Sequence, residues 1–121
     1  MAETEKLVIL ATHGPDSPEL ATIPFVMACA ALASDVEVVM GFQGDGVSLM
    51  HKGEADSVQA PDFPPLSKLL ADFHDLGGVA LVCSPCAKSR GIGDSLVEGA
   101  EIVAAGRFVA EVTSAKTCIT Y

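Results

Sequence analysis

Tryptophan is absent from the 121-residue chain, tyrosine occurs once, and seven lysines and arginines stand against sixteen acidic residues. The basic residues form no run, and the formal net charge is −9. A protein that binds phosphate backbones needs a basic stripe or patch, so we expect no nucleic-acid partner. The negative charge favours solubility and carries no information about the fold.

Long hydrophobic runs are also missing. The longest, residues 23–33, is too short to span a bilayer and contains Pro24. The start, MAETEK, is polar and acidic, unlike the basic lead of a signal peptide. We therefore expect a cytoplasmic protein without a membrane span. In a reducing compartment, the four cysteines are more often reactive or simply buried than paired in disulfides.

Apolar segments that alternate between strand and helix patterns predict the fold. Continuous apolar runs suit strands of a parallel sheet that is covered on both faces. We predict strands at residues 6–12, 36–40, 78–83, 100–103 and 116–121, and helices at 18–34, 46–51, 64–76, after Cys83 and at 104–115. Such alternation implies right-handed crossovers. The predicted class is α/β: a single three-layer domain over residues 1–121 with a mostly parallel, doubly wound sheet of about five strands.

The helix predicted at residues 18–34 is apolar around nearly its whole circumference. Ser17 suits the N-cap and Pro18 the first helical position, whereas Pro24 would kink the helix. We expect one side of this helix to pack on the sheet and the other on a second partner. Cys29 in this helix and Cys118 in the last strand are interpreted as buried core residues.

The topology also predicts where a site would lie. In doubly wound sheets, ligands bind beyond the carboxyl ends of the strands, where the strand order reverses. If the order begins 2-1-3, the reversal lies between the first and third strands. The loops that follow these strands begin at His13 and Cys83, and the glycine-rich loop at residues 41–46 lies beside them. Three loops would then share one crevice.

Other polar residues near these loops receive simpler interpretations. Asp16 is interpreted as a turn residue and Asp45 as a loop acid. His51 and His74 are interpreted as surface residues.

The stretch LVCSPCAKSRG, residues 81–91, contains the motif with the most chemistry. Cys83 ends a predicted strand, Ser84 can cap the next helix, Pro85 suits its first position, and Cys86 falls in its first turn. Free backbone N–H groups at a helix start favour thiolate over thiol. A lysine and an arginine follow within four residues of Cys86. The pattern predicts an electropositive pocket around a nucleophilic sulfur.

Cys-x-x-Cys is compatible with other chemistry. Tetrahedral zinc needs four ligands, and a set made of Cys83, Cys86, His13 and His51 is conceivable, although the histidines are scattered. Dithiol–disulfide exchange is a second possibility, because Cys-x-x-Cys between a strand and a helix is its signature. A third is a non-catalytic oligomer whose crevice holds a metal or a small anion.

The motif and its surroundings resemble the DsrE/DsrF-like family, which includes sulfur-relay proteins of the TusD type. The similarity extends over VCSPCAKSRGI, LVEGAEIVAAGRFVAEV, THGPDSPELATIPFVMACAAL and FQGDGVSLMHKG, and so over nearly the whole chain. Its most specific element is a cysteine at a strand end, seven residues before an Arg-Gly pair. Cys83 and Arg90-Gly91 match that spacing. Cys86 departs from the relay-type pattern, although a Cys-x-x-Cys form occurs among less characterised relatives.

The resemblance implies a DsrE-like α/β domain that forms homo-oligomers, typically trimers or hexamers. It also implies transfer of sulfane sulfur between donor and acceptor proteins or small sulfur compounds, possible sulfurtransferase activity, and no metal or organic cofactor. Cys83 would carry the persulfide, and a subunit interface would cover the second face of the apolar helix.

Two interpretations remain open for each of the other candidate site residues. Cys86 is either a resolving thiol or second sulfur site, or a passive residue of the first turn. Arg90 holds the thiolate or a carboxylate of a partner, or else ends the helix with Gly91 as C-cap. His13 is a proton shuttle or pocket wall, or else a solvated loop residue.

Overall fold

A computed structural model describes residues 4–121, so part of the polar start, residues 1–3, lies outside the described residues. Its strands are β1 Lys6–Ala11, β2 Glu37–Phe42, β3 Val79–Cys83, β4 Ala100–Val103 and β5 Thr117–Thr120. Its α-helices are α1 Pro18–Ala33, α2 Leu66–Asp75, α3 Ser84–Ser89 and α4 Ala105–Ser114. Two 3₁₀ helices, η1 Gly44–Met50 and η2 Glu54–Ser57, lie between β2 and α2. The α/β class is therefore confirmed, and η2 occupies a segment with no element predicted.

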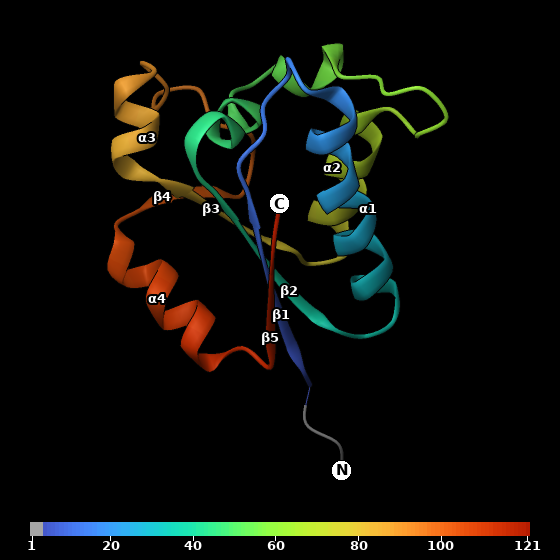
Figure 1. The fold of residues 1–121 in the computed structure, drawn as a ribbon, viewed down its shortest axis with the longest axis vertical. Helices are drawn as coiled ribbons and strands as arrows, with labels where there is room; N and C mark the ends of the chain where they lie inside the picture. Colours follow the sequence, from blue (N-terminus) through green and yellow to red (C-terminus); the bar gives the residue numbers. More distant parts are fainter. Residues whose placement is uncertain (1–3) are drawn as a thin grey trace.

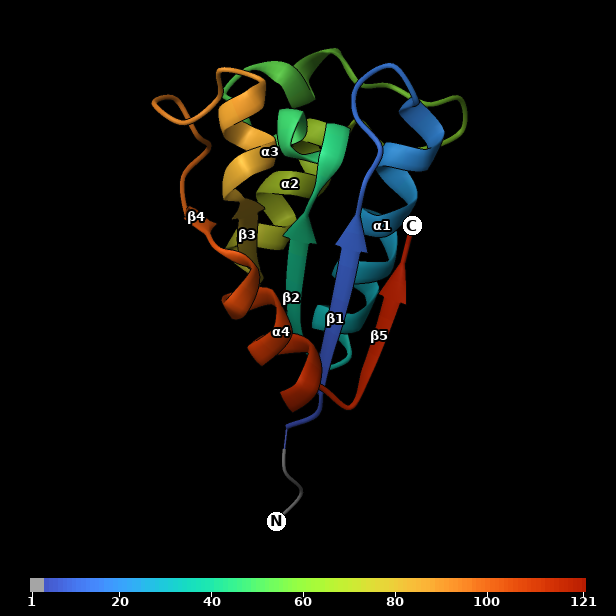
Figure 2. The same ribbon diagram turned by 60° about the vertical axis from the view of Figure 1, so that its left-hand side comes forward.

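All strand pairs are parallel, and the order in the sheet is β4-β3-β2-β1-β5. Figure 2 shows the five strands pointing toward the same end of the molecule. The order 2-1-3, on which the predicted position of the crevice was conditional, does not occur, because β2 lies between β1 and β3. From β1 to β4, each new strand is added on the same side of the one before it. The connection through α4 then places β5 on the other side of β1. The reversal of strand order therefore lies between β1 and β5.

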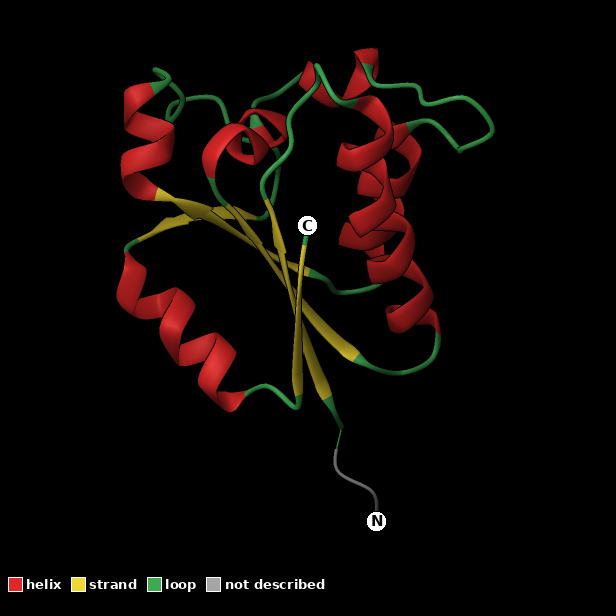
Figure 3. Ribbon diagram, in the orientation of Figure 1, coloured by secondary structure: helices red, strands yellow, loops and turns green. Residues whose placement is uncertain are grey.

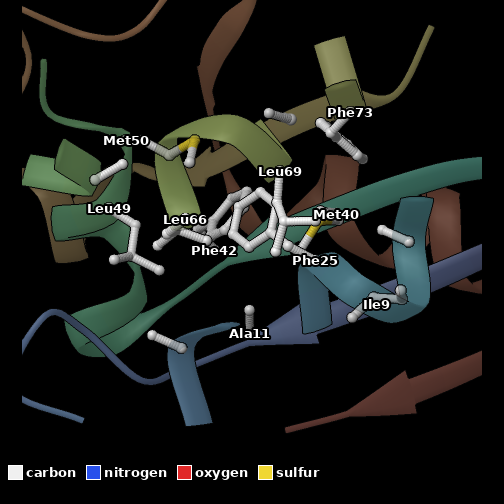
Figure 4. Close-up of a cluster of buried hydrophobic side chains, with 14 of the residues drawn as sticks. Ile9, Ala11, Phe25, Met40, Phe42, Leu49, Met50, Leu66, Leu69 and Phe73 are labelled. Atoms are coloured by element: carbon white, nitrogen blue, oxygen red, sulfur yellow. The ribbon is translucent and has the colours of Figure 1, made fainter. Parts of the chain in front are cut away.

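The helices cover the two faces of the sheet unequally. In Figures 1 and 3, α1 and α2 lie on one side of the sheet and α4 lies on the other. The larger core forms beneath α1 and α2, where Phe25 packs against Phe42 and Phe73 with ring centroids 5.7 and 5.9 Å apart. Figure 4 shows these rings surrounded by aliphatic side chains and methionines. Burial of this apolar surface is the main stabilising contribution to the fold.

The smaller core forms beneath α4 and explains why β2 is longer than predicted. We expected this strand to end before Gly41, but it continues through Phe42. A Cβ atom at Gly41 would lie 2.5 Å from Phe108 Cε1 and 2.8 Å from Leu10 Cδ2. Glycine therefore marks the place where α4 approaches the strand, and not the end of the strand.

Helix α1 continues through Pro24 without a break. One of its faces is buried against the sheet and α2, whereas Leu20 and Met27 are 46% and 41% exposed. In a single chain, the second face therefore stays open. Among the described residues, no helix combines the length and the apolar character that crossing a membrane requires.

Candidate functional site

Loops from neighbouring strands meet at the carboxyl end of the sheet. The N–H of Gln43, after β2, donates to the carbonyl of Ala11 at the end of β1, with 3.1 Å between the atoms. A Cβ atom at Gly46 would lie 2.3 Å from that same carbonyl oxygen, and one at Gly14 would lie 2.7 Å from Asp45 O. The loop that contains His13 is therefore pressed against the start of η1, although β1 and β3 are not adjacent.

The cysteine motif joins β3 to α3 one residue earlier than predicted. Cys83 has extended backbone angles (φ −62°, ψ 120°) and is the N-cap, while Ser84 is already helical. Cys86 thus lies at the third helical position. Helix α3 has six residues, so its dipole is small, and any effect on the sulfur atoms must come from direct neighbours.

The two thiols of the motif are in direct contact. All four cysteines are free, and Cys83 and Cys86 are both half-buried. Burial raises the pKa of Cys83, and the hydrogen bond that it shares with Cys86 raises it further. The same hydrogen bond lowers the pKa of Cys86. Our expectation that both sulfurs favour the thiolate is therefore wrong for Cys83, which contacts both hydrophobic cores at its strand end.

A second donor to Cys86 comes from the loop after β2. The backbone N–H of Gly44 donates to the Cys86 sulfur and lowers its pKa further. Gly44 has φ +55°, a left-handed conformation that glycine adopts at little cost. The Cys86 sulfur thus accepts hydrogen bonds from the Cys83 thiol and from the N–H of Gly44, and its own backbone N–H makes a smaller contribution.

Arg90 connects the two segments that surround Cys86. Its Nη2 lies 2.8 Å from Asp45 Oδ1, and its Nη1 donates to the carbonyl of Cys86 at 3.1 Å. The positive charge also lowers the pKa of both cysteines, as a smaller contribution than the hydrogen bonds. Arg90 is the C-cap of α3 as well, so it ends the helix and contributes to the electrostatics of the site.

A cavity of about 500 Å³ adjoins Arg90. Asp16, Asp45 and His51 line it together with Arg90, and Glu54 contributes a third carboxylate. His51 is half-buried, and its place beside the cavity is a position that the interpretation of it as a surface residue did not include. Asp45 is also more than a loop acid, because it holds Arg90. His74 is exposed, as expected.

His13 lies in the loop that packs on η1. Its Nδ1 atom is buried and has no hydrogen-bond partner within the described part of the chain. The solvated-loop interpretation therefore does not apply to this nitrogen. His13 is not among the residues that line the cavity beside Arg90.

The side chains needed for a metal centre do not gather at this site. Across residues 4–121, no group of three or more histidine, cysteine, aspartate or glutamate side chains could hold a metal ion. The conceivable set of Cys83, Cys86, His13 and His51 is therefore not assembled. A tetrahedral zinc site needs four such ligands.

Replacing Arg90 with glutamine is expected to slow alkylation of Cys86 a few-fold at neutral pH, because the loss of positive charge raises the thiol pKa. The ion pair to Asp45 is partly exposed, so stability should fall by less than about 1 kcal/mol. Arg107→Gln is the matched control, since Arg107 pairs with Glu101 and Glu111 on the α4 side of the molecule. An Arg90→Gln protein that reacts as fast as the wild type would contradict this role.

Sequence reasoning placed the loop at residues 41–46 at the crevice, but it did not single out Gly44, and it interpreted Asp45 as a loop acid without a contact at the site. Their contacts to Cys86 and Arg90 connect segments about forty residues apart, and no local spacing reports such contacts. A usable signal was their position after β2, because the carboxyl ends of parallel strands meet at one edge of the sheet.

Comparisons with known proteins agree with this fold. Residues 5–121 match the DsrE/DsrF-like family. The uncharacterized protein MJ0760 of Methanocaldococcus jannaschii is 36% identical over 110 residues, which cover 90% of this chain and 40% of that protein. The uncharacterized protein MJ0989 of the same organism is 29% identical over 117 residues, covering 96% and 99% of the two chains. The chain thus spans less than half of MJ0760 and nearly all of MJ0989.

Two solved structures share the fold. The YchN protein from E. coli superposes with a TM-score of 0.84 at 21% identity, covering 98% of this chain and all of that one. The protein of unknown function BT1422 from Bacteroides thetaiotaomicron gives a TM-score of 0.71 at 12% identity, covering 97% and 95% of the two chains. At such identities, the similarity establishes the fold alone.

Proposed function

Because the chain belongs to the DsrE/DsrF-like family, we propose that it carries sulfane sulfur as a persulfide on Cys83. At the level of the family, membership points to sulfur relay. The observation that supports the proposal is the pair of half-buried free thiols at the end of β3, one of which has a lowered pKa. Thiol–persulfide exchange needs a thiolate and access, but no metal or organic cofactor.

The shared hydrogen bond suggests how a thiol with a raised pKa can react. Cys83 would transfer its proton to the Cys86 thiolate while its sulfur attacks the outer sulfur of a persulfide donor. A new S–S bond forms, the donor leaves as a thiolate, and the products are the Cys83 persulfide and the Cys86 thiol. An acceptor thiolate then removes the outer sulfur, which restores the Cys83 sulfur.

Other residues at the site have supporting roles in this proposal. Arg90 stabilises the thiolate form of the pair through its charge and holds Asp45. The unpartnered Nδ1 of His13 is suited to proton transfer or to contact with a bound sulfur compound. Partners would be donor and acceptor proteins, or small sulfur compounds, in the reducing cytoplasm.

The loading test uses a persulfide donor and the intact mass of the full chain. Cys86→Ala should still gain one sulfur atom, more slowly because the base is missing. Cys83→Ala should gain none, because the carrier is lost together with the hydrogen bond that lowers the pKa of Cys86. Cys118→Ala, in the core beside α4, is the matched control and should load like the wild type. Uptake by Cys83→Ala, or by no protein, would overturn the proposal.

The direct contact between the thiols also supports the alternative function, dithiol–disulfide exchange without bound sulfur. That function predicts reversible loss of two hydrogens with a bond between Cys83 and Cys86, and a measurable equilibrium with glutathione. If oxidation never joins these two residues, redox exchange is excluded.

A homo-oligomer, a trimer or a hexamer, is part of the same proposal. The outer face of α1, with Leu20 and Met27 partly exposed and Glu19 as its charged residue in the first turn, is a suitable surface for a second copy of the chain. Gel filtration with light scattering should give the mass of three or six chains, and a Met27→Glu variant should dissociate. A monomeric wild type would contradict this part of the proposal.

A further inference from the structure

Cys86, the proton acceptor in the proposed loading step, is also a second sulfur nucleophile beside Cys83. A persulfide on Cys83 would form beside the Cys86 sulfur, with which Cys83 already shares a hydrogen bond. A thiolate next to a persulfide can displace its outer sulfur. The residue that accepts the Cys83 proton during loading is therefore also placed to react with the loaded persulfide.

We propose that the pair also discharges bound sulfur as hydrogen sulfide, with the Cys86 sulfur attacking the Cys83 sulfur of the persulfide. This activity rests on the proposed function, because the persulfide must first form. It makes the protein a sulfane-sulfur reductase as well as a carrier. The balance between the two activities then depends on whether an acceptor thiol reaches the persulfide before Cys86 does.

The step balances in atoms and electrons. The Cys86 thiolate forms a bond to Cys83 Sγ, the bond from Cys83 Sγ to the outer sulfur breaks, and hydrosulfide leaves with the electron pair. The outer sulfur gains two electrons, and the two cysteines lose them as their disulfide forms. A dithiol reductant then returns the disulfide to two thiols.

The geometry favours attack on the Cys83 sulfur. Cys83 is the N-cap of α3 and Cys86 is its third residue, so both lie on one turn and are within the span that a disulfide can bridge. The N–H of Gly44 and the charge of Arg90 lower the pKa of Cys86, which favours the nucleophilic thiolate once the proton taken up during loading has been released. Both sulfurs are half-buried rather than enclosed, which leaves the disulfide accessible to a reductant.

The test follows a single discharge in the full chain, with Cys29→Ser and Cys118→Ala present so that only the site thiols react. The protein is loaded with glutathione persulfide whose terminal sulfur is isotopically labelled, and excess reagent is removed. Sulfide is then trapped with a bimane reagent while the intact mass is followed. Without added reductant, the amount of labelled sulfide should equal the amount of disulfide formed between Cys83 and Cys86.

The Cys86→Ser variant should keep the label on Cys83 and release sulfide at least about tenfold more slowly. The equal yields of sulfide and disulfide need no substitution at the site, so the test does not depend on the folding of this variant. If the loaded protein with both thiols keeps its label, or if Cys86→Ser releases sulfide as fast, discharge is excluded and the carrier function stands. If no protein takes up label, the carrier function itself fails, and discharge with it.

Discussion

Cys86→Ser is expected to slow the reaction of the native protein with iodoacetamide at neutral pH by at least about tenfold, because the thiolate is the reactive form. The hydrogen bonds from Cys83 and Gly44 lower the pKa of Cys86, whereas burial raises the pKa of Cys83. Of the two thiols in the motif, the one that remains in this variant, Cys83, is therefore the less reactive. Quenching the alkylation at successive times and analysing the peptides by mass spectrometry gives the rate of reaction at each cysteine.

The pH dependence of the same reaction follows from the sign of the shift. The fraction of Cys86 thiolate rises as pH increases through a pKa below that of an ordinary cysteine, so fast alkylation should begin at lower pH than in a denatured control. Cys83→Ala removes the largest cause of the lowered pKa and should move the profile to higher pH. Retention of the fast reaction in Cys86→Ser, with its loss in Cys83→Ala, would assign the thiolate to Cys83 instead.

Gly46→Ala is expected to destabilise the protein by about 1–3 kcal/mol, the usual cost of forcing extra volume into a packed site. The new Cβ would lie 2.3 Å from the carbonyl oxygen of Ala11 and 3.0 Å from its carbonyl carbon. These are backbone atoms at the end of a buried strand, so they cannot yield as a flexible side chain does. Because η1 must then move, Gly44 should shift from Cys86, and alkylation of Cys86 should become slower.

Gly106→Ala is the matched control for this substitution. No atom lies within 4 Å of the position that a Cβ would take at Gly106, and its φ is not positive. Alanine in helix α4 should therefore leave stability unchanged or raise it by up to about 1 kcal/mol. Equal urea midpoints for the two variants would show that the approach of η1 to β1 is not as tight as described.

The class of the fold could be predicted because it depends on local patterns. Apolar runs such as residues 6–12, alternating with segments of helical period, identify a parallel sheet without any long-range information. The order of the strands could not be predicted in this way. Right-handed crossovers allow β3 to join either side of the first two strands, and the side is decided by packing, including the contact of α2 with α1.

The candidate site was predictable in its chemistry and not in its electrostatics. Cys83, Cys86 and Arg90 are close in sequence, so the motif itself identifies them. The difference between the two thiols depends on the burial of Cys83 and on a donor from Gly44. The burial of Cys83 and the hydrogen bond from Gly44 both depend on tertiary contacts. The dipole of the short helix α3 contributes little to the pKa of either thiol.

The most direct test of the central claim locates the transferred sulfur at the level of single residues. The Cys86→Ala protein, in which discharge is blocked, is loaded with a persulfide donor carrying labelled sulfur, quenched in acid and mapped by peptide mass spectrometry. Label is expected on Cys83 and on neither Cys29 nor Cys118. Label on either of those two cysteines in place of Cys83, or on no cysteine, would contradict the central claim.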